Sequence, residues 1–193
     1  GYRKYFMKSK ITLRKKCLEK REIFFKKKGS GCLKLKDIEV IILEIKSKLK
    51  ISSIGIYYPI KSEISPLKLI DICDKLSINI CLPIIEKKTN ELIFSKFDNE
   101  VNITKNEYGI IEPNKISQII PDIIFVPMVG FDKTLNRLGY GKGYYDRTIS
   151  KLRKLKKIFV IGLAYDNQMV RNIPAENHDE KMDIILTDKK IYR

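Results

Sequence analysis

Histidine and cysteine are both scarce in this sequence, and their scarcity excludes several kinds of site. The 193 residues include one histidine, His178, and four cysteines, none of which forms a CxxC pair. A zinc site is therefore not expected, and no cysteine has a sequence neighbour that would make it a catalytic thiolate. We expect reduced, mostly buried thiols in a cytoplasmic protein. We interpret His178 as a loop residue held by local hydrogen bonds rather than as a catalytic base.

Long apolar runs are also absent. The longest apolar stretches have the length of single strands, so no membrane span is expected. The basic N-terminus is not followed by the apolar segment of a secretory signal. Because the sequence begins with Gly1, we interpret residues 1–7 as an N-terminal extension or an expression remnant, with Met7 as a candidate start. Residues 8–193 are expected to form a single domain, long enough to bury a core without disulfides.

Acidic residues are too few to balance the basic ones. The sequence has 23 Asp and Glu against 39 Lys and Arg, which gives a net charge of +16. Such an excess is typical of proteins that bind nucleic acids or anionic membranes, and of enzymes with polyanionic substrates. No RNP-type aromatic motif, zinc finger or KH loop accompanies it. We interpret most of the charge as solvated surface and expect neither nucleic acid nor membrane as a partner. A basic nucleic-acid-binding protein stays open as an alternative, on net charge alone.

Strand-like and helix-like patterns alternate along the chain. Dense runs of β-branched and aromatic residues predict buried strands, and amphipathic spacing predicts helices between them. The strands are expected at residues 51–58, 78–82, 122–126, 158–164 and 183–187, with 91–96 completing a hairpin and 101–103 as a candidate short strand. The helices are expected at residues 8–28, 33–49, 66–76 and 144–155. This alternation predicts an α/β fold with a largely parallel sheet and helices on both faces.

The segment at residues 136–147, NRLGYGKGYYDR, concentrates residues that can carry chemistry. Its three glycines permit positive φ and close backbone approach to a ligand. Exposed N–H groups in such a loop form an anion-binding nest, Lys142 and two arginines add positive charge, and Asp146 is a candidate magnesium ligand. The spacing fits neither a Walker A loop nor a dinucleotide fingerprint. We interpret it as a phosphate-binding loop with a metal ligand at its end; a plain glycine-rich turn is the alternative.

The predicted neighbours of this loop favour ligand binding. The loop follows the carboxyl end of the strand at 122–126 and precedes the helix at 144–155, whose N-terminal dipole attracts anions. Glu63 lies in a polar loop after the strand at 51–58, at the edge where open α/β sheets bind ligands. Taken alone, Glu63 would be a solvated acid, and the cations of the first helix an exposed basic face.

The segment at residues 126–147, VPMVGFDKTLNRLGYGKGYYDR, resembles the signature of the 5-formyltetrahydrofolate cyclo-ligase family, also called methenyltetrahydrofolate synthetase. That signature joins a strand-ending proline, a Phe-Asp pair and an RLGxGxGYYD run, all at the expected spacing. Further matches are KITLR at residues 10–14, Glu63 after the first strand, Glu112-Pro113, and an HDxxMD segment at residues 178–183. The resemblance covers nearly the whole chain in order.

The resemblance implies a fold and a reaction. It implies a single catalytic domain, three-layered α/β/α, over residues 8–193. Such a domain uses ATP and Mg²⁺ to convert 5-formyltetrahydrofolate to 5,10-methenyltetrahydrofolate, releasing ADP and phosphate. The formyl oxygen would attack the γ-phosphoryl group, N10 of the folate would attack the activated formyl carbon, and phosphate would leave. It further implies a cytoplasmic ligase of one-carbon metabolism, which we expect to be a monomer.

The resemblance also assigns residues to ligands. Tyr58 and Glu63 match folate-binding positions, where a carboxylate can accept hydrogen bonds from pterin N–H groups. Asp146 and Asp183 match the magnesium positions. The residues that match ATP-binding positions are Lys10, Arg14, Arg137, Leu138, Gly139, Tyr140, Gly141, Lys142, Gly143, Tyr144 and Tyr145, and those from Tyr140 to Tyr144 also match folate contacts. Arg137, Lys142 and Tyr144 are the expected catalytic residues, because phosphoryl transfer depends on positioning and charge neutralisation.

The folate side of the expected site is less defined than the ATP side. Residues 84–88, IIEKK, lack the aromatic or Arg-rich segment that some members of the family carry. The basic charge of the chain would suit a polyglutamylated folate as substrate. A phosphosugar isomerase or acyl-transfer enzyme on a similar sheet also stays open, with the glycine loop binding a substrate phosphate and no role for ATP.

Overall fold

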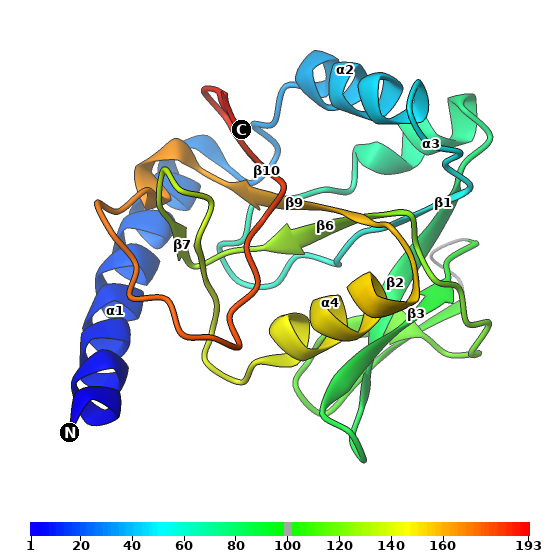
Figure 1. Ribbon diagram of the computed structural model, residues 1–193. Helices are drawn as coiled ribbons and strands as arrows, with labels where there is room; N and C mark the ends of the chain where they lie inside the picture. The colour runs from blue at the N-terminus through cyan, green and yellow to red at the C-terminus, as the bar shows by residue number, and fades with distance from the viewer. Residues whose placement is uncertain (99–101) are drawn as a thin grey trace.

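The fold is built on a seven-stranded sheet (Figure 1). A computed structural model describes residues 1–98 and 102–193, without the side chains of residues 6–8. The strands of this sheet are β1 (Ser53–Gly55), β2 (Asn79–Glu86), β3 (Glu91–Lys96), β6 (Ile123–Pro127), β9 (Phe159–Ala164), β10 (Ile184–Thr187) and β11 (Ile191–Tyr192). Their order is β11-β10-β9-β6-β1-β2-β3. The five inner strands run parallel, whereas β3 and β11 pair antiparallel at the two edges.

The direction of winding reverses between β1 and β6. From β1 the chain moves outward to β2 and then returns to the other side of β1 to form β6, β9 and β10 in turn. In open parallel sheets, ligands bind at the carboxyl ends of the strands where this reversal occurs. Residues 56–66 follow β1 and residues 128–143 follow β6, so both loops predicted to bind ligands leave the sheet at this position.

Helices cover both faces of the sheet. The helices are α1 (Tyr2–Lys28), α2 (Leu35–Lys46), α3 (Leu69–Lys75) and α4 (Tyr144–Leu155), with a short 3₁₀ helix, η2 (Asp166–Gln168). Side chains of β6 alternate between two cores: Ile123 and Phe125 join the core under α2 and α3, whereas Ile124 and Val126 join the core under α4. Figure 1 shows α2 and α3 on one side of the sheet and α4 on the other. The predicted three-layer α/β/α fold is thus confirmed.

The first helix, α1, stands beside the end of β6 (Figure 1). It ends at Lys28 as predicted, because Gly29 follows with φ 74°, but it begins at Tyr2, six residues before the predicted start. A third apolar cluster holds α1 against the loops that follow β6 and β9; it contains Cys17, Val129, Leu138 and Ile173. The cations of α1 are therefore carried to the edge of the sheet where the ligand loops lie.

Two strands differ in length from the predictions. β1 pairs over three residues rather than eight, although Ile56 and Tyr57 beyond it remain buried. β2 continues through Pro83 to Glu86 rather than ending at the proline. The pairing of β1 with β2 ends at Cys81, before Pro83, which pairs with Phe94 of the edge strand β3. Because proline has no backbone N–H, it can lie here without the loss of a hydrogen bond to β1.

Smaller differences concern turns and short strands. The Leu67 N–H donates to the Ser65 hydroxyl, as expected of a cap, but the regular helix begins only at Leu69. Two short hairpins complete the fold, formed by β4 (Ile103–Lys105) with β5 (Ile111–Pro113) and by β7 (Gly130–Phe131) with β8 (Arg137–Leu138). Of the candidate strand at residues 101–103, Ile103 begins β4 and Val101 lies outside the described residues. In the described part of the chain, no helix is long and apolar enough to cross a membrane.

Asp132 fixes the turn that leads into the glycine-rich segment. It is 1% exposed, and its two carboxylate oxygens accept hydrogen bonds from the Thr134 N–H and hydroxyl, from the Asn136 N–H and side-chain amide, and from the Ile173 N–H. Burial raises the pKa of Asp132, but these hydrogen bonds outweigh it and hold the pKa below its usual value. One carboxylate thus organises the turn and ties it to the segment before His178.

Replacing Asp132 by asparagine should lower the free energy of unfolding by about 2–4 kcal/mol at pH 7, because charge-assisted hydrogen bonds are lost in a buried place. The folded pKa lies below the unfolded one, so the contribution is complete above the unfolded pKa of about 4 and is lost as pH falls through the folded value. Urea denaturation at pH 7 and at a pH below the folded pKa of Asp132 measures both effects. The difference between wild type and variant should shrink in acid, whereas the exposed Asp71→Asn control should differ little from wild type at either pH.

Candidate functional site

The glycine loop, residues 137–143, begins in β8 and ends at the N-cap of α4. Gly141 has φ 103° and Gly143 has φ 72°, so two of its three glycines hold conformations that other residues adopt at a cost. Gly143 is the N-cap of α4, and no side chain caps this end of the helix. The first N–H groups of α4 therefore have no partner within the helix. Together with the helix dipole they form a site suited to a phosphate group.

Two cations of α1 make contacts with other segments: Arg14 reaches the glycine loop, and Lys10 reaches the segment before β10. The Arg14 Nε–H donates to the Gly139 carbonyl at 2.8 Å, so the guanidinium lies directly on the glycine loop. Burial lowers the pKa of Arg14 from its usual value. The Lys10 ammonium lies 2.7 Å from Asp179 and 3.7 Å from Glu176, in the segment before β10. Lys10 is 8% exposed, so its charge is placed at the site rather than in free solvent.

Arg137 and Leu138 anchor the start of the loop. Arg137 donates through Nε to the Pro127 carbonyl at 2.9 Å, and its guanidinium lies 5.0 Å from the ring centroid of Tyr145. Leu138 is buried in the cluster that holds α1. The arginine is thus fixed between the end of β6 and Tyr145 in the first turn of α4.

Glu63 and the glycine loop are joined by a hydrogen bond. The Tyr140 hydroxyl donates to Glu63 Oε2 at 3.0 Å, and the Ile60 N–H donates to Glu63 Oε1 at 2.8 Å. Glu63 is 4% exposed. Its burial raises its pKa, and the Ile60 N–H, the Arg21 guanidinium and the Tyr140 hydroxyl oppose that rise. The loop after β1 and the loop after β6 therefore share one polar network, although 77 residues separate Glu63 from Tyr140.

Arg21 completes this network and is not among the residues predicted from the sequence. Its guanidinium is 1% exposed and donates to the Ser62 hydroxyl at 2.9 Å and to the Tyr140 hydroxyl at 2.8 Å. Arg21 follows Arg14 by seven residues, which places both on one face of α1. That spacing is the signal in the sequence; the burial of Arg21 follows from tertiary packing. Tyr58 lies in the same loop as Glu63, half-buried against the core under α2 and α3.

Lys142 lies on the exposed side of the loop. Its ammonium is 4.3 Å from the ring centroid of Tyr108, at the tip of the β4–β5 hairpin. The hydroxyls of Tyr108 and Tyr144 interact, which contributes to a raised pKa of Tyr108. Arg147 donates to the Lys142 carbonyl at 2.8 Å and to the Asn90 carbonyl at 2.9 and 2.8 Å. The loop is thus braced from two hairpins, while the Lys142 side chain extends toward Tyr108.

The two predicted metal ligands have different surroundings. Asp146, in the first turn of α4, accepts the Glu180 N–H at 3.0 Å. Asp183 accepts the Val160 N–H at 2.8 Å and lies 3.3 Å from Arg153. Arg153 follows Asp146 by seven residues, about 10 Å along α4. Asp146 therefore lies next to the glycine loop, whereas Asp183 is paired with a residue further along α4. That the two carboxylates share one metal ion stays a prediction.

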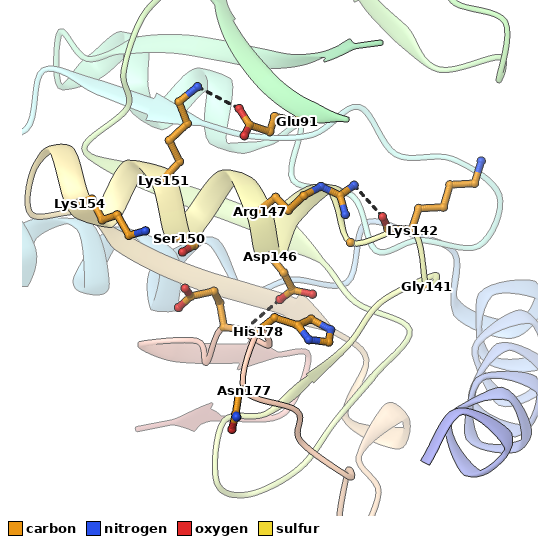
Figure 2. A pocket seen from close by; sticks show the side chains of 12 residues that line it. Glu91, Gly141, Lys142, Asp146, Arg147, Ser150, Lys151, Lys154, Asn177 and His178 are labelled. Carbon is orange, nitrogen blue, oxygen red and sulfur yellow. Dashed lines mark hydrogen bonds and ion pairs between the residues drawn. The ribbon is translucent and has the colours of Figure 1, made fainter. Parts of the chain in front are cut away.

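A groove of about 520 Å³ runs from the glycine loop along α4 (Figure 2). Gly141, Lys142 and Asp146 line the end nearest the loop, and Lys151 and Lys154 line the other side. Two further carboxylates line the groove, Glu91, which pairs with Lys151 at 2.9 Å, and Glu180, which pairs with Arg153 at 2.7 Å. Asp146 is the lining carboxylate in the first turn of α4. An acid at that position would repel a bound phosphate unless a cation lay between them. The hard oxygen donors present there suit magnesium.

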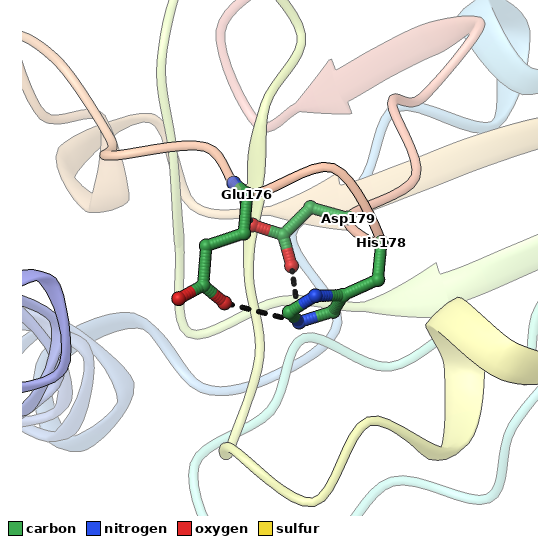
Figure 3. Close-up of side chains that lie close together, drawn as sticks. All are labelled: Glu176, His178 and Asp179. Carbon is green, nitrogen blue, oxygen red and sulfur yellow. Dashed lines mark hydrogen bonds and ion pairs between the residues drawn. The ribbon is translucent and has the colours of Figure 1, made fainter. Parts of the chain in front are cut away.

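His178 belongs to a separate cluster at the mouth of this groove (Figure 3). Its Nε2 lies 3.0 Å from Glu176 and 3.5 Å from Asp179, and these three residues could together offer ligands to a metal. The Lys10 ammonium, however, already binds both carboxylates. The cluster is therefore an ion-pair network, in keeping with the interpretation of His178 as a locally bonded loop residue.

Comparisons with known proteins agree on one family. The 5-formyltetrahydrofolate cyclo-ligase family matches residues 6–188. A 5-formyltetrahydrofolate cyclo-ligase of Haemophilus influenzae is 36% identical over 69% of this chain and 74% of its own, and one of Mycoplasma pneumoniae is 32% identical over 93% and 99%. The solved structure of a 5,10-methenyltetrahydrofolate synthetase from Mycoplasma pneumoniae has a TM-score of 0.69 at 27% identity, covering 93% of this chain and 98% of that one. The corresponding structure from Aquifex aeolicus has a TM-score of 0.68 at 30% identity, covering 95% and 92%.

Proposed function

The chain belongs to the 5-formyltetrahydrofolate cyclo-ligase family, and we propose that it converts 5-formyltetrahydrofolate to 5,10-methenyltetrahydrofolate with ATP and Mg²⁺, releasing ADP and phosphate. The observation that best supports this proposal is the hydrogen bond between Tyr140 and Glu63. It supports the proposal because it joins the glycine loop, which would bind the phosphates, to the carboxylate that would bind the folate. A phosphoryl group can pass directly between two ligands only if their sites adjoin in this way.

The glycine loop and its cations would bind ATP. The N–H groups at the start of α4 and the Lys142 ammonium suit the β- and γ-phosphates. Arg14 reaches the loop from α1 and Arg137 from β8, so positive charge flanks the phosphates on more than one side. Lys10, tied to Asp179, would draw the segment before β10 over the nucleotide.

Glu63 would orient the folate. Its two oxygens accept one described hydrogen bond each, from Ile60 and Tyr140, and a carboxylate has room for further donors. The pterin ring offers N–H groups of this kind, and Tyr58 and Tyr144 offer aromatic surface nearby. The formyl group would then point toward the γ-phosphate held by the glycine loop.

The reaction needs two displacements. The formyl oxygen attacks the γ-phosphorus, and the bond to ADP breaks. N10 then attacks the formyl carbon with its lone pair, the carbon–oxygen bond breaks, and the oxygen leaves with phosphate while N10 loses its proton. Lys142 and Arg137 offset negative charge as the phosphoryl group moves, and Tyr144 helps to position it, so no nucleophilic side chain is required.

Asp146 is the residue that we propose to hold Mg²⁺ directly. It lines the groove beside Lys142 and the helix terminus, where the bound ion would neutralise phosphate charge. Asp183, engaged by Arg153 and Val160, would act by holding the segment before β10. We further propose that the enzyme is a cytoplasmic monomer; its four free cysteines suit a reducing compartment.

An absorbance assay tests the proposal. The folded protein is incubated with 5-formyltetrahydrofolate, ATP and MgCl₂, and methenyltetrahydrofolate is followed in the near ultraviolet. Signal should require the protein, ATP and magnesium together, and ADP should form in equal amount. Folded protein that gives no ATP-dependent signal would refute the proposal. Hydrolysis or transfer of a phosphosugar without ATP would instead favour the alternative on a similar sheet.

A further inference from the structure

Arg21 is buried where three segments of the chain meet. Its guanidinium donates to the Ser62 hydroxyl after β1, to the Met128 carbonyl after β6 at 3.4 Å, and to the Tyr140 hydroxyl in the glycine loop. A buried charge is costly unless hydrogen bonds replace its hydration. The fork of the guanidinium lets one side chain hold all three partners at once, which a lysine could not do.

Tyr140 links this guanidinium to Glu63. Its hydroxyl accepts from Arg21 and donates to Glu63, so one proton fixes the direction of both hydrogen bonds. Burial raises the pKa of Tyr140 to about 12, so the hydroxyl keeps its proton at physiological pH. The Arg21 guanidinium also lies 5.6 Å from the Tyr140 ring centroid. The chain Arg21–Tyr140–Glu63 is therefore a single arrangement rather than three independent contacts.

We propose that Arg21 is a positioning residue and that the Tyr140 hydroxyl, through its hydrogen bond to Glu63, couples the nucleotide site to the folate site. This inference rests on the proposed function, in which the glycine loop binds ATP and Glu63 binds the folate. Arg21 holds the loops after β1 and β6 in one relative position through Ser62, Met128 and Tyr140. Ordering the glycine loop around phosphates then orders Tyr140, and through it the carboxylate that receives the folate.

The coupling has a thermodynamic consequence. If nucleotide tightens folate binding, folate must tighten nucleotide binding by the same factor. Couplings of this kind are typically about 5- to 150-fold. Since the Tyr140 hydroxyl is the described connection between the glycine loop and Glu63, its removal should abolish most of the coupling while each site keeps its own remaining contacts.

Tyr140→Phe tests this inference, because it deletes the hydroxyl and keeps the ring. Calorimetry gives the affinity for 5-formyltetrahydrofolate with and without a non-hydrolysable ATP analogue and Mg²⁺. In the wild type the analogue should tighten folate binding at least about fivefold, and in Tyr140→Phe the ratio should fall toward one. Tyr192→Phe removes a hydroxyl that donates to Asp166, away from both loops, and should keep the wild-type ratio.

The pH dependence of kcat/KM separates positioning from general damage. Glu63 interacts electrostatically with the titratable and charged groups Arg21, Arg137, Tyr57, Tyr140, Tyr145 and Tyr165. Tyr140→Phe removes a hydrogen bond to the ionised carboxylate, so the acid limb of the profile should move to higher pH. A variant that was merely less well folded would lose activity without moving that limb.

Arg21 variants extend the test. Arg21→Lys keeps the positive charge but loses the planar guanidinium that donates to three partners, so it should lose coupling about as completely as Tyr140→Phe. If the Arg21→Lys protein does not fold, the result for Tyr140→Phe still decides. Wild-type protein that binds both ligands without coupling, or Tyr140→Phe that keeps the wild-type ratio, would overturn this inference and leave the proposed function standing. Folded wild-type protein that binds no 5-formyltetrahydrofolate would overturn the proposed function and this inference with it.

Discussion

Replacing Lys142 by alanine should lower kcat by roughly 30- to 800-fold, the loss of about 2–4 kcal/mol of transition-state stabilisation. Lys142 carries the ammonium of the glycine loop, next to the uncapped N-terminus of α4. As the phosphoryl group leaves ADP, negative charge spreads over oxygens that this ammonium and the helix N–H groups would face. Steady-state rates at saturating ATP and folate measure the effect on kcat directly.

A matched control distinguishes this role from the general charge of the groove. Lys154→Ala removes the same charge from α4, in the same groove but farther from the loop. It should change KM for ATP by less than about threefold and leave kcat unchanged, because exposed charges beyond a Debye length of ~10 Å are screened. A kcat near wild type in Lys142→Ala would contradict the role assigned to it.

The contact between Lys142 and Tyr108 does not oppose this role. The ammonium lies 4.3 Å from the ring centroid, on an exposed surface. A cation–π contact at such a place contributes about 0.5–1 kcal/mol. That is less than the 2–4 kcal/mol assigned to charge neutralisation. In the proposed reaction, moving Lys142 from the ring to a phosphate would thus be favourable overall, and Tyr108 would hold the ammonium near the loop before a phosphate binds.

Much of the fold follows from the sequence where local pattern and tertiary packing agree. The helix predicted at 144–155 is observed as α4 (Tyr144–Leu155), because one stripe of the sequence is apolar and a glycine precedes it. The apolar run at 51–58 shows the limit of such patterns. Ile56 and Tyr57 are buried but lie outside the paired residues of β1. An apolar run in the sequence therefore predicts burial, but not which residues pair with a neighbouring strand.

The geometry of the glycine loop could be predicted where the motif is continuous in the sequence. The glycine loop, its lysine and its following helix form a continuous segment, so their proximity needs no tertiary information. Arg21 shows why the rest could not be predicted. It lies in a helix crowded with exposed cations, and only packing against Ser62 and Tyr140 distinguishes it from Lys20 beside it. Whether Asp146 and Asp183 lie close enough to share a metal ion also depends on tertiary packing, which the local sequence pattern does not predict.

Replacing Asp146 by alanine should reduce turnover by about 100-fold or more at ordinary magnesium concentrations. Asp146 is the carboxylate that lines the groove at the glycine loop, and in the proposed reaction its charge would repel the phosphates unless a cation lay between them. The protein should stay folded, because the described hydrogen bond lost is one from the Glu180 N–H at the surface of α4. Rates measured across a magnesium titration should show a requirement shifted to higher concentration.

Asp183→Asn provides the contrast that assigns the metal. Asp183 lies in an ion pair with Arg153 that is partly open to solvent, so its loss should cost about 0.5–1 kcal/mol of stability. If Asp146 alone contacts the ion, Asp183→Asn should change the magnesium requirement by less than about threefold. Equal shifts in both variants would show that the two carboxylates share the metal, and that the segment before β10 moves toward the glycine loop when magnesium and nucleotide bind. A shift in Asp183→Asn alone would reverse the assignment.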